Sequence, residues 1–113
     1  MGLFDFFFGN KIVSLNSDEW SYQFNNDENA LIIDVRTPSE CKQGIIKGAK
    51  NLNLLDSGEF HNEIKKLDKS KNYYVYCRGG TRSKKACSIM KKMGIKNTYN
   101  LEGGISSYKS KLS

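Results

Sequence analysis

The sequence YYVYCRGGTRS, residues 73–83, determines how the rest of the chain is organised. Its β-branched and aromatic opening favours a strand, and residues 83–93 after it read as a helix. The short loop between them begins at Cys77, contains two adjacent glycines and closes with Arg82. A loop from the carboxyl end of a strand to the amino end of a helix directs several backbone N–H groups at one point. The positive end of the helix dipole lies at that same point.

Cys77 is the candidate nucleophile of this loop. A thiol beside such donors loses its proton more readily, because the thiolate is the form that they stabilise. Gly79 and Gly80 allow the loop to wrap around an anion, and Arg78 and Arg82 add positive charge. A small buried cysteine before an ordinary glycine turn is the alternative, but it explains neither the paired arginines nor the paired glycines. The loop is therefore predicted to hold an anion around a reactive cysteine.

The segment CRGGTRS, residues 77–83, resembles the active-site loop of single-domain rhodaneses, a family of sulfurtransferases. Three further stretches resemble the family in the same order: residues 31–36 (LIIDVR), 44–53 (GIIKGAKNLN) and 100–104 (NLEGG). The resemblance covers roughly residues 11 to 112. It implies an α/β, rhodanese-like fold, with a central parallel five-stranded sheet, helices on both faces and the site at the carboxyl ends of the strands.

The resemblance also implies the roles of the site residues. Cys77 is expected to be catalytic and to carry sulfur as a persulfide, with the rest of the loop binding the substrate: Arg78, Gly79, Gly80, Thr81 and Arg82. Asp34, Arg36 and Ser83 are expected to support this site. For Asp34 and Arg36, a surface ion pair that contributes little is the alternative.

The expected activity is that of a thiosulfate sulfurtransferase, which moves a sulfane sulfur from thiosulfate, or from a persulfide donor, to a thiol or cyanide. The acceptor thiol can belong to a thioredoxin-like or other protein. A persulfide carrier or partner-binding module with little thiosulfate turnover would have the same loop, so it stays an alternative. A cysteine phosphatase is less favoured. Only four residues separate Cys77 from Arg82, where phosphatases of the related fold have five, and those enzymes usually have a histidine at the position of Tyr76.

Composition agrees with one globular domain over residues 11–113, after a short apolar lead-in at residues 1–10. The three cysteines form no Cys-x2-Cys pair and His61 is the single histidine, so we expect neither a metal nor another cofactor. The net charge of +6 comes from scattered lysines without a recognition motif, so we expect no nucleic-acid partner.

The lead-in is unusually aromatic, with Phe4, Phe6, Phe7 and Phe8. It is too short and lacks the flanking charge for a signal peptide or a membrane span, and we expect a cytoplasmic protein. We expect the lead-in to pack on the domain. A membrane-surface or self-association contact is the alternative, since clustered exposed aromatics usually mark a contact.

The remaining elements follow from local patterns. Residues 11–15 and 97–101 are predicted strands, residues 30–35 a strand covered on both faces, and residues 59–67 an amphipathic helix. Helix starts are predicted at Asn16 or Ser17 and at Thr37, with a glutamate three residues after Asn16 and after Thr37. Cys87 is expected in the core. Cys41, where the family usually has an aromatic residue, is expected to be a small apolar filler, with a resolving thiol as the alternative.

Overall fold

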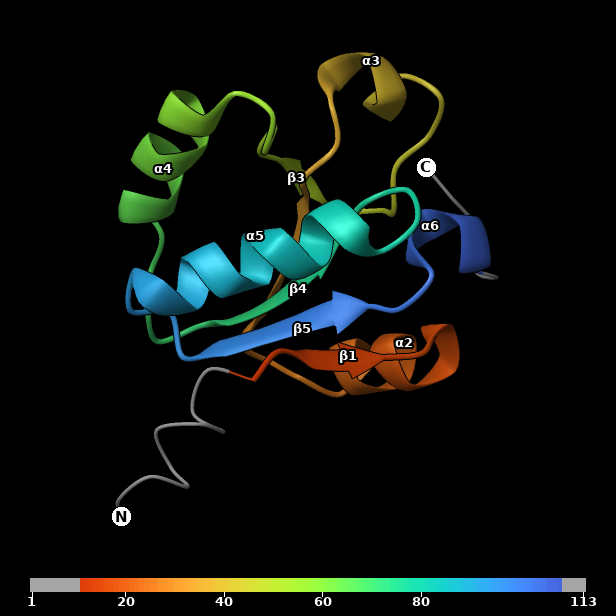
Figure 1. The fold of residues 1–113 in the computed structure, drawn as a ribbon. Helices are drawn as coiled ribbons and strands as arrows, with labels where there is room; N and C mark the ends of the chain where they lie inside the picture. The colour runs from red at the N-terminus through yellow and green to blue at the C-terminus, as the bar shows by residue number, and fades with distance from the viewer. Residues whose placement is uncertain (1–10, 109–113) are drawn as a thin grey trace.

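The computed structural model describes residues 11–108, so the aromatic lead-in and the last five residues lie outside the described part. Strands and helices alternate along the chain (Figure 1). The elements are β1 (Val13–Leu15), α2 (Ser17–Asn25), β2 (Ala30–Asp34), α3 (Pro38–Cys41), β3 (Lys50–Asn51), α4 (Ser57–Lys65), β4 (Asn72–Tyr76), α5 (Thr81–Lys92), β5 (Asn97–Leu101) and α6 (Gly104–Ser107).

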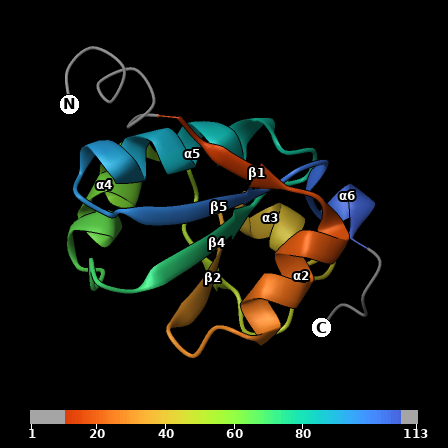
Figure 2. The ribbon, with the colours of Figure 1, turned by 90° about the horizontal axis from the view of Figure 1, so that it is seen from below.

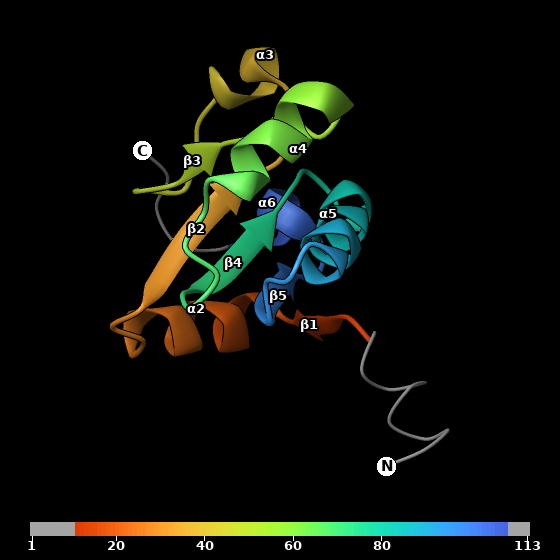
Figure 3. The same cartoon turned by 90° about the vertical axis from the view of Figure 1, so that its left-hand side faces the viewer.

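The five strands form one parallel sheet in the order β1-β5-β4-β2-β3. Helices α4 and α5 cover one face and α2 covers the other, as Figure 3 shows with the sheet between them. The predicted α/β class and five-stranded parallel sheet are confirmed. Because all strands run the same way, the carboxyl ends of β4 and β5 lie together, next to α6 (Figure 1).

Alternate residues of β4 enter two different cores. Tyr73 and Val75 pack with the side chains of α4 and α5, whereas Tyr74 and Tyr76 pack around Trp20 of α2. Both faces of this strand are therefore buried, which explains its continuous apolar sequence. The same holds for β2 except at Leu31, which is 45% exposed, so the cover is incomplete near the amino end of that strand.

Local hydrogen bonds explain where the helices begin. The predicted capping boxes are present at Asn16 with Glu19, and at Thr37 with Glu40. Helix α4 begins two residues earlier than predicted, because the Asp56 side chain caps it by accepting a hydrogen bond from the backbone N–H of Glu59.

Helix α5 also begins two residues early, at Thr81 rather than residue 83. The reason is Gly80, whose φ of 102° is a left-handed conformation that glycine adopts without strain. The chain therefore turns sharply at Gly80, and the first turn of the helix belongs to the loop around Cys77. The edge strand β1 lies beside β5, on the side away from β4 (Figure 2).

Candidate active site

Cys77 directly follows β4, at the carboxyl end of the sheet, and its side chain is buried. Two donors from the α5 start reach its sulfur: the backbone N–H of Gly80 lies 3.1 Å from Sγ, and the Ser83 hydroxyl lies 3.3 Å from it. Gly79 is exposed, so the loop borders solvent above the buried thiol. The strand end and the helix start thus meet at one sulfur atom.

Burial alone would raise the pKa of the Cys77 thiol. The Ser83 hydroxyl and the N–H groups of Ser83, Gly80 and Gly79 outweigh that effect, because they stabilise the thiolate, and the pKa lies below its usual value of 9.0. The helix dipole of α5 acts in the same direction. This sulfur is therefore easier to ionise than an ordinary thiol, although it is buried.

The other two cysteines have the opposite character. Burial is the main reason that the pKa of Cys41 rises to about 11 and that of Cys87 to about 12. Cys87 is fully buried, as expected of a core residue, and the Cys41 thiol donates a hydrogen bond of 3.4 Å to Asp34. Both of these thiols are protonated at neutral pH, and Cys77 differs from them in that its pKa is lowered rather than raised.

The turn after β5 packs against the loop that carries Cys77 and donates hydrogen bonds to it. The N–H groups of Ile105 and Ser106 donate to the carbonyls of Cys77 and Arg78, at 2.9 and 3.1 Å. Gly104 lies against the same two carbonyls, and a Cβ on it would be 2.3 Å from the Arg78 oxygen. Nothing in the sequence predicted that residues 103–106 would pack against the loop that carries Cys77.

The two loop arginines have different surroundings. The Arg82 guanidinium forms a two-pronged ion pair with Glu40 of α3, at 2.7 and 2.8 Å. That pair is the main reason that the pKa of Glu40 falls to about 2. Arg78 is exposed, and it lines a pocket of about 240 Å³ together with Ile105 and other residues. The predicted substrate contacts of Arg78 and Arg82, and of Gly79, Gly80 and Thr81 between them, stay predictions.

Asp34 and Arg36 form a buried ion pair at 2.8 Å, with side chains 0% and 6% exposed. The alternative of a surface pair is therefore wrong. Arg36 also donates to the carbonyls of Gly44 and Glu40, at 2.7 and 3.4 Å, so it ties the segment after β2 together. Glu40 in turn binds Arg82, so Glu40 links Arg36 to the loop, and the predicted supporting role of Asp34 and Arg36 stays a prediction.

The Rhodanese-like domain family matches residues 17–111 of the chain. The chain belongs to the rhodanese-like family. A sulfurtransferase of Allochromatium vinosum is 32% identical to it over 93 residues, which are 80% of this chain and 82% of that protein. The rhodanese-like domain protein of Staphylococcus aureus has the same fold, with a TM-score of 0.77 and 29% identity over 90% of this chain and 97% of its own.

Other relatives are longer than this chain. The tRNA uridine(34) hydroxylase of Pelagibacter ubique is 39% identical over 83 residues, and that of the Wolbachia from Brugia malayi is 38% identical over 96 residues. These matches cover 74% and 83% of this chain, but only 28% and 35% of the two hydroxylases. The chain therefore spans about a third of the length of these relatives.

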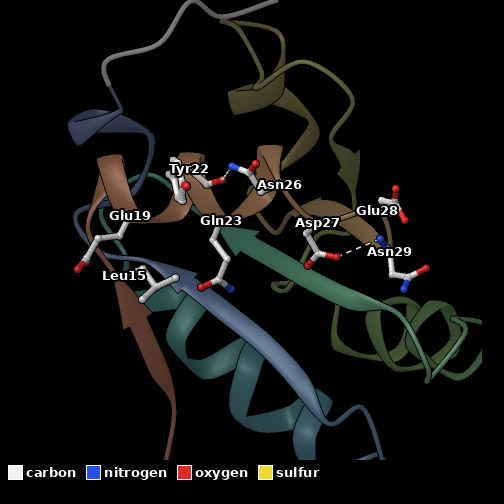
Figure 4. Close-up of a pocket in the computed structure, with 8 residues that line it drawn as sticks. All are labelled: Leu15, Glu19, Tyr22, Gln23, Asn26, Asp27, Glu28 and Asn29. Carbon is white, nitrogen blue, oxygen red and sulfur yellow. Dashed lines mark hydrogen bonds between the residues drawn. The ribbon is translucent and has the colours of Figure 1, made fainter.

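A larger pocket, of about 740 Å³, lies away from the rhodanese-like loop, and it is lined by the end of β1, by α2 and by residues 26–29 after α2 (Figure 4). Its lining includes the carboxylates of Glu19, Asp27 and Glu28 and contains neither a cation nor a thiol. It is therefore unsuited to an anionic sulfur compound. Within residues 11–108, no three potential metal ligands gather and no helix is long and apolar enough to cross a membrane.

Sequence reasoning placed Cys77 and Ser83 together, and the structure does so. It did not associate Glu40 or Asn100 with the site, although Glu40 binds Arg82 and Asn100 binds Ser83. The capping pattern around Glu40 was visible in the sequence, but its second partner lies 42 residues away. Asn100 begins the family-like stretch NLEGG, but nothing in that stretch showed that its side chain would bind Ser83.

Proposed function

We propose that the chain is a sulfurtransferase that forms a persulfide on Cys77. The observation that carries the proposal is the environment of Cys77 Sγ, which receives hydrogen bonds from Gly80 and Ser83 and has a lowered pKa. A stabilised thiolate at a helix start is the form needed for nucleophilic attack. The sulfurtransferase of Allochromatium vinosum, similar over most of both chains, supports the proposal.

In the first half-reaction the Cys77 thiolate attacks the outer sulfur of thiosulfate. A new S–S bond forms to Sγ, the S–S bond of thiosulfate breaks, and sulfite leaves with the electron pair of that bond. The outer sulfur stays on the enzyme as an anionic persulfide. The exposed loop around Gly79 supplies N–H groups for this charge, and preorganised donors of this kind contribute about a hundredfold or more in rate.

In the second half-reaction a thiol or cyanide attacks that outer sulfur. The bond between the two sulfurs breaks, and Cys77 Sγ leaves as a thiolate with the electron pair. The product is a persulfide or thiocyanate. Because Sγ becomes charged again at this point, the Gly80 N–H and the Ser83 hydroxyl that bind it lower the barrier of this step also.

Arg78 is the better placed of the two loop arginines to attract a dianion, because it is exposed and its guanidinium forms no ion pair with any described residue. The charge of Arg82 is shared with Glu40. We therefore propose that Arg78 makes the direct charge-assisted contact with thiosulfate, while Arg82 holds the helix start against α3. Arg78→Ala is expected to raise KM for thiosulfate.

The test compares two sulfur donors. Turnover with thiosulfate and cyanide is measured beside transfer from a protein persulfide to a protein thiol, for wild type and for Cys77→Ser. Sulfur transfer that depends on Cys77 supports the proposal, and retained activity in Cys77→Ser would overturn it. Efficient protein transfer with a very high KM for thiosulfate would instead identify a persulfide carrier. Cys41→Ser is the matched control, because its thiol is protonated at neutral pH.

A second candidate function is a part in the hydroxylation of tRNA uridine 34. The observation that favours it is the 39% identity with a protein of that name, although the chain corresponds to only 28% of its length. The net charge of +6 would suit an RNA substrate, against the sequence-based expectation of no nucleic-acid partner. Hydroxylation is an oxidation, so the test is nucleoside mass analysis of tRNA incubated with the chain under air, where dioxygen can serve as the oxidant; uridine that stays unmodified would contradict this candidate.

A further inference from the structure

The hydroxyl of Ser83 lies between two acceptors below the catalytic loop. Its oxygen is 3.3 Å from Cys77 Sγ and 2.5 Å from Asn100 Oδ1, and all three residues are at most 3% exposed. A serine hydroxyl has a single hydrogen, so it can donate to one of these acceptors at a time. Asn100 Oδ1 and Cys77 Sγ therefore compete for this hydrogen.

The orientation of the Asn100 amide follows from its neighbours. Its nitrogen faces the Gly80 carbonyl at 3.4 Å, and a carbonyl can only accept a hydrogen bond. The nitrogen also donates to the Ser14 hydroxyl at 3.1 Å, across the paired strands β1 and β5. The amide oxygen must then face Ser83 and act as an acceptor.

The charge on Cys77 decides which acceptor receives the hydrogen. When Sγ is a neutral thiol, the Ser83 hydroxyl donates to Asn100, and the thiol can donate to the Ser83 oxygen. When the thiol proton leaves for solvent, a hydrogen bond to the thiolate is the stronger one, because it is charge-assisted. The hydroxyl then rotates to Sγ, and Asn100 Oδ1 loses its donor.

We propose that Asn100 is a positioning residue that holds the Ser83 hydrogen while Cys77 Sγ is uncharged and releases it when Sγ becomes charged. The inference rests on the proposed function for its use. In the persulfide the charge lies on the outer sulfur, so Asn100 keeps the hydroxyl oriented until Sγ leaves as a thiolate. Asn100 also makes ionisation of the resting Cys77 thiol less favourable, because ionisation takes a hydrogen bond away from the buried amide oxygen of Asn100.

Two titratable side chains of α5, Arg82 and Cys87, interact electrostatically with Cys77, and Arg82 is paired with Glu40 of α3. Cys87, with a pKa of about 12, stays neutral over the pH range of interest. Arg78 lies next in sequence and is exposed. None of these groups contacts Asn100 through a hydrogen bond within residues 11–108, so its effect can be separated from theirs.

The test is a set of four proteins: wild type, Ser83→Ala, Asn100→Leu and the double variant. The rate of iodoacetamide alkylation at Cys77, resolved from the other cysteines by peptide mass mapping, is measured against pH without any sulfur donor. We expect Ser83→Ala to raise the pKa of Cys77. Asn100→Leu should lower it by about one unit, a tenfold change in ionisation constant, and should not lower it in the Ser83→Ala background.

The proposal is overturned if Asn100→Leu shifts the pKa of Cys77 equally in the wild-type and Ser83→Ala backgrounds, or if it shifts that pKa in neither. It is also overturned if Asn100→Leu raises the pKa of Cys77 only when Ser83 is present. It is also overturned if Ser83→Ala leaves the pKa unchanged. Circular dichroism checks the fold of each protein, and Asn100→Val, which suits a strand, replaces Asn100→Leu if the latter does not fold. Because no sulfur donor is present, a failure here is distinct from a failure of the sulfurtransferase proposal.

Discussion

Replacing Gly104 by alanine should displace the loop that carries Cys77. A Cβ at this position would lie 2.3 Å from the Arg78 carbonyl oxygen and 2.6 Å from that of Cys77. Ordinary contacts between such atoms are about 3.5 Å, so the turn and the loop must separate by about 1 Å. Both hydrogen bonds from the N–H groups of Ile105 and Ser106 to these carbonyls would be strained by that shift.

The expected cost has two parts. Gly104 has a φ of +63°, a left-handed conformation that costs alanine about 1–2 kcal/mol. Overpacking against backbone atoms costs about a further 1–3 kcal/mol. The free energy of unfolding should therefore fall by ~2–5 kcal/mol. A misplacement of about 1 Å can reduce a catalysed rate by about a hundredfold, and we expect that loss in sulfur transfer.

The matched control is Gly48→Ala. Gly48 also has a positive φ, of +88°, but a Cβ there meets no atom within 4 Å. In urea unfolding, Gly48→Ala should lose only the ~1–2 kcal/mol that the left-handed conformation costs alanine, and its rate of sulfur transfer should be unchanged. If Gly104→Ala loses no more stability than Gly48→Ala and retains full activity, the turn after β5 does not hold the loop in place.

Three further outcomes are expected. The pH midpoint for alkylation of Cys77 should lie below 9.0, since hydrogen bonds to the thiolate outweigh burial; a midpoint at or above that value contradicts the site description. Asp34→Asn leaves the buried charge of Arg36 without its partner, so the free energy of unfolding should fall by ~3–5 kcal/mol in urea titrations. A loss below about 1 kcal/mol would mean that the pair is not buried in solution. The pKa of Glu40 is lowered from 4.5 to about 2, so its pairing with Arg82 stabilises the fold above pH 4.5 and loses that contribution as the pH falls toward 2. Both side chains are about a quarter exposed, so Glu40→Gln should lower the free energy of unfolding by ~1–2 kcal/mol at neutral pH. The variant should also lose less stability than the wild type as the pH falls from 4.5 toward 2. An equal loss in both proteins would show that another group controls the acid dependence.

The order of elements and the position of Cys77 could be predicted because they depend on residues close together in the chain. The apolar run before Asp34 predicts a strand buried on both faces, and the aromatic run before Cys77 predicts another strand. The start of α5 was misplaced by two residues, because nothing local revealed that Gly80 adopts a left-handed conformation as its cap. Element boundaries depend on such single caps.

The contacts that shape the site could not be predicted in the same way. Glu40 reaches Arg82 across 42 residues of sequence, and Asn100 reaches Ser83 across 17. Both pairs form only because the parallel sheet brings the carboxyl ends of its strands together. The sequence therefore suggested two free arginines at the loop, whereas the Arg82 guanidinium is bound by a carboxylate.

The central claim is that Cys77 Sγ accepts a second sulfur atom. Intact-protein mass spectrometry after brief incubation with thiosulfate tests it most directly, followed by peptide mapping under non-reducing conditions. We expect a gain of one sulfur atom per chain, located on Cys77, absent from Cys77→Ser and reversed by cyanide. An unchanged mass, or a sulfur atom located on Cys41, would contradict it.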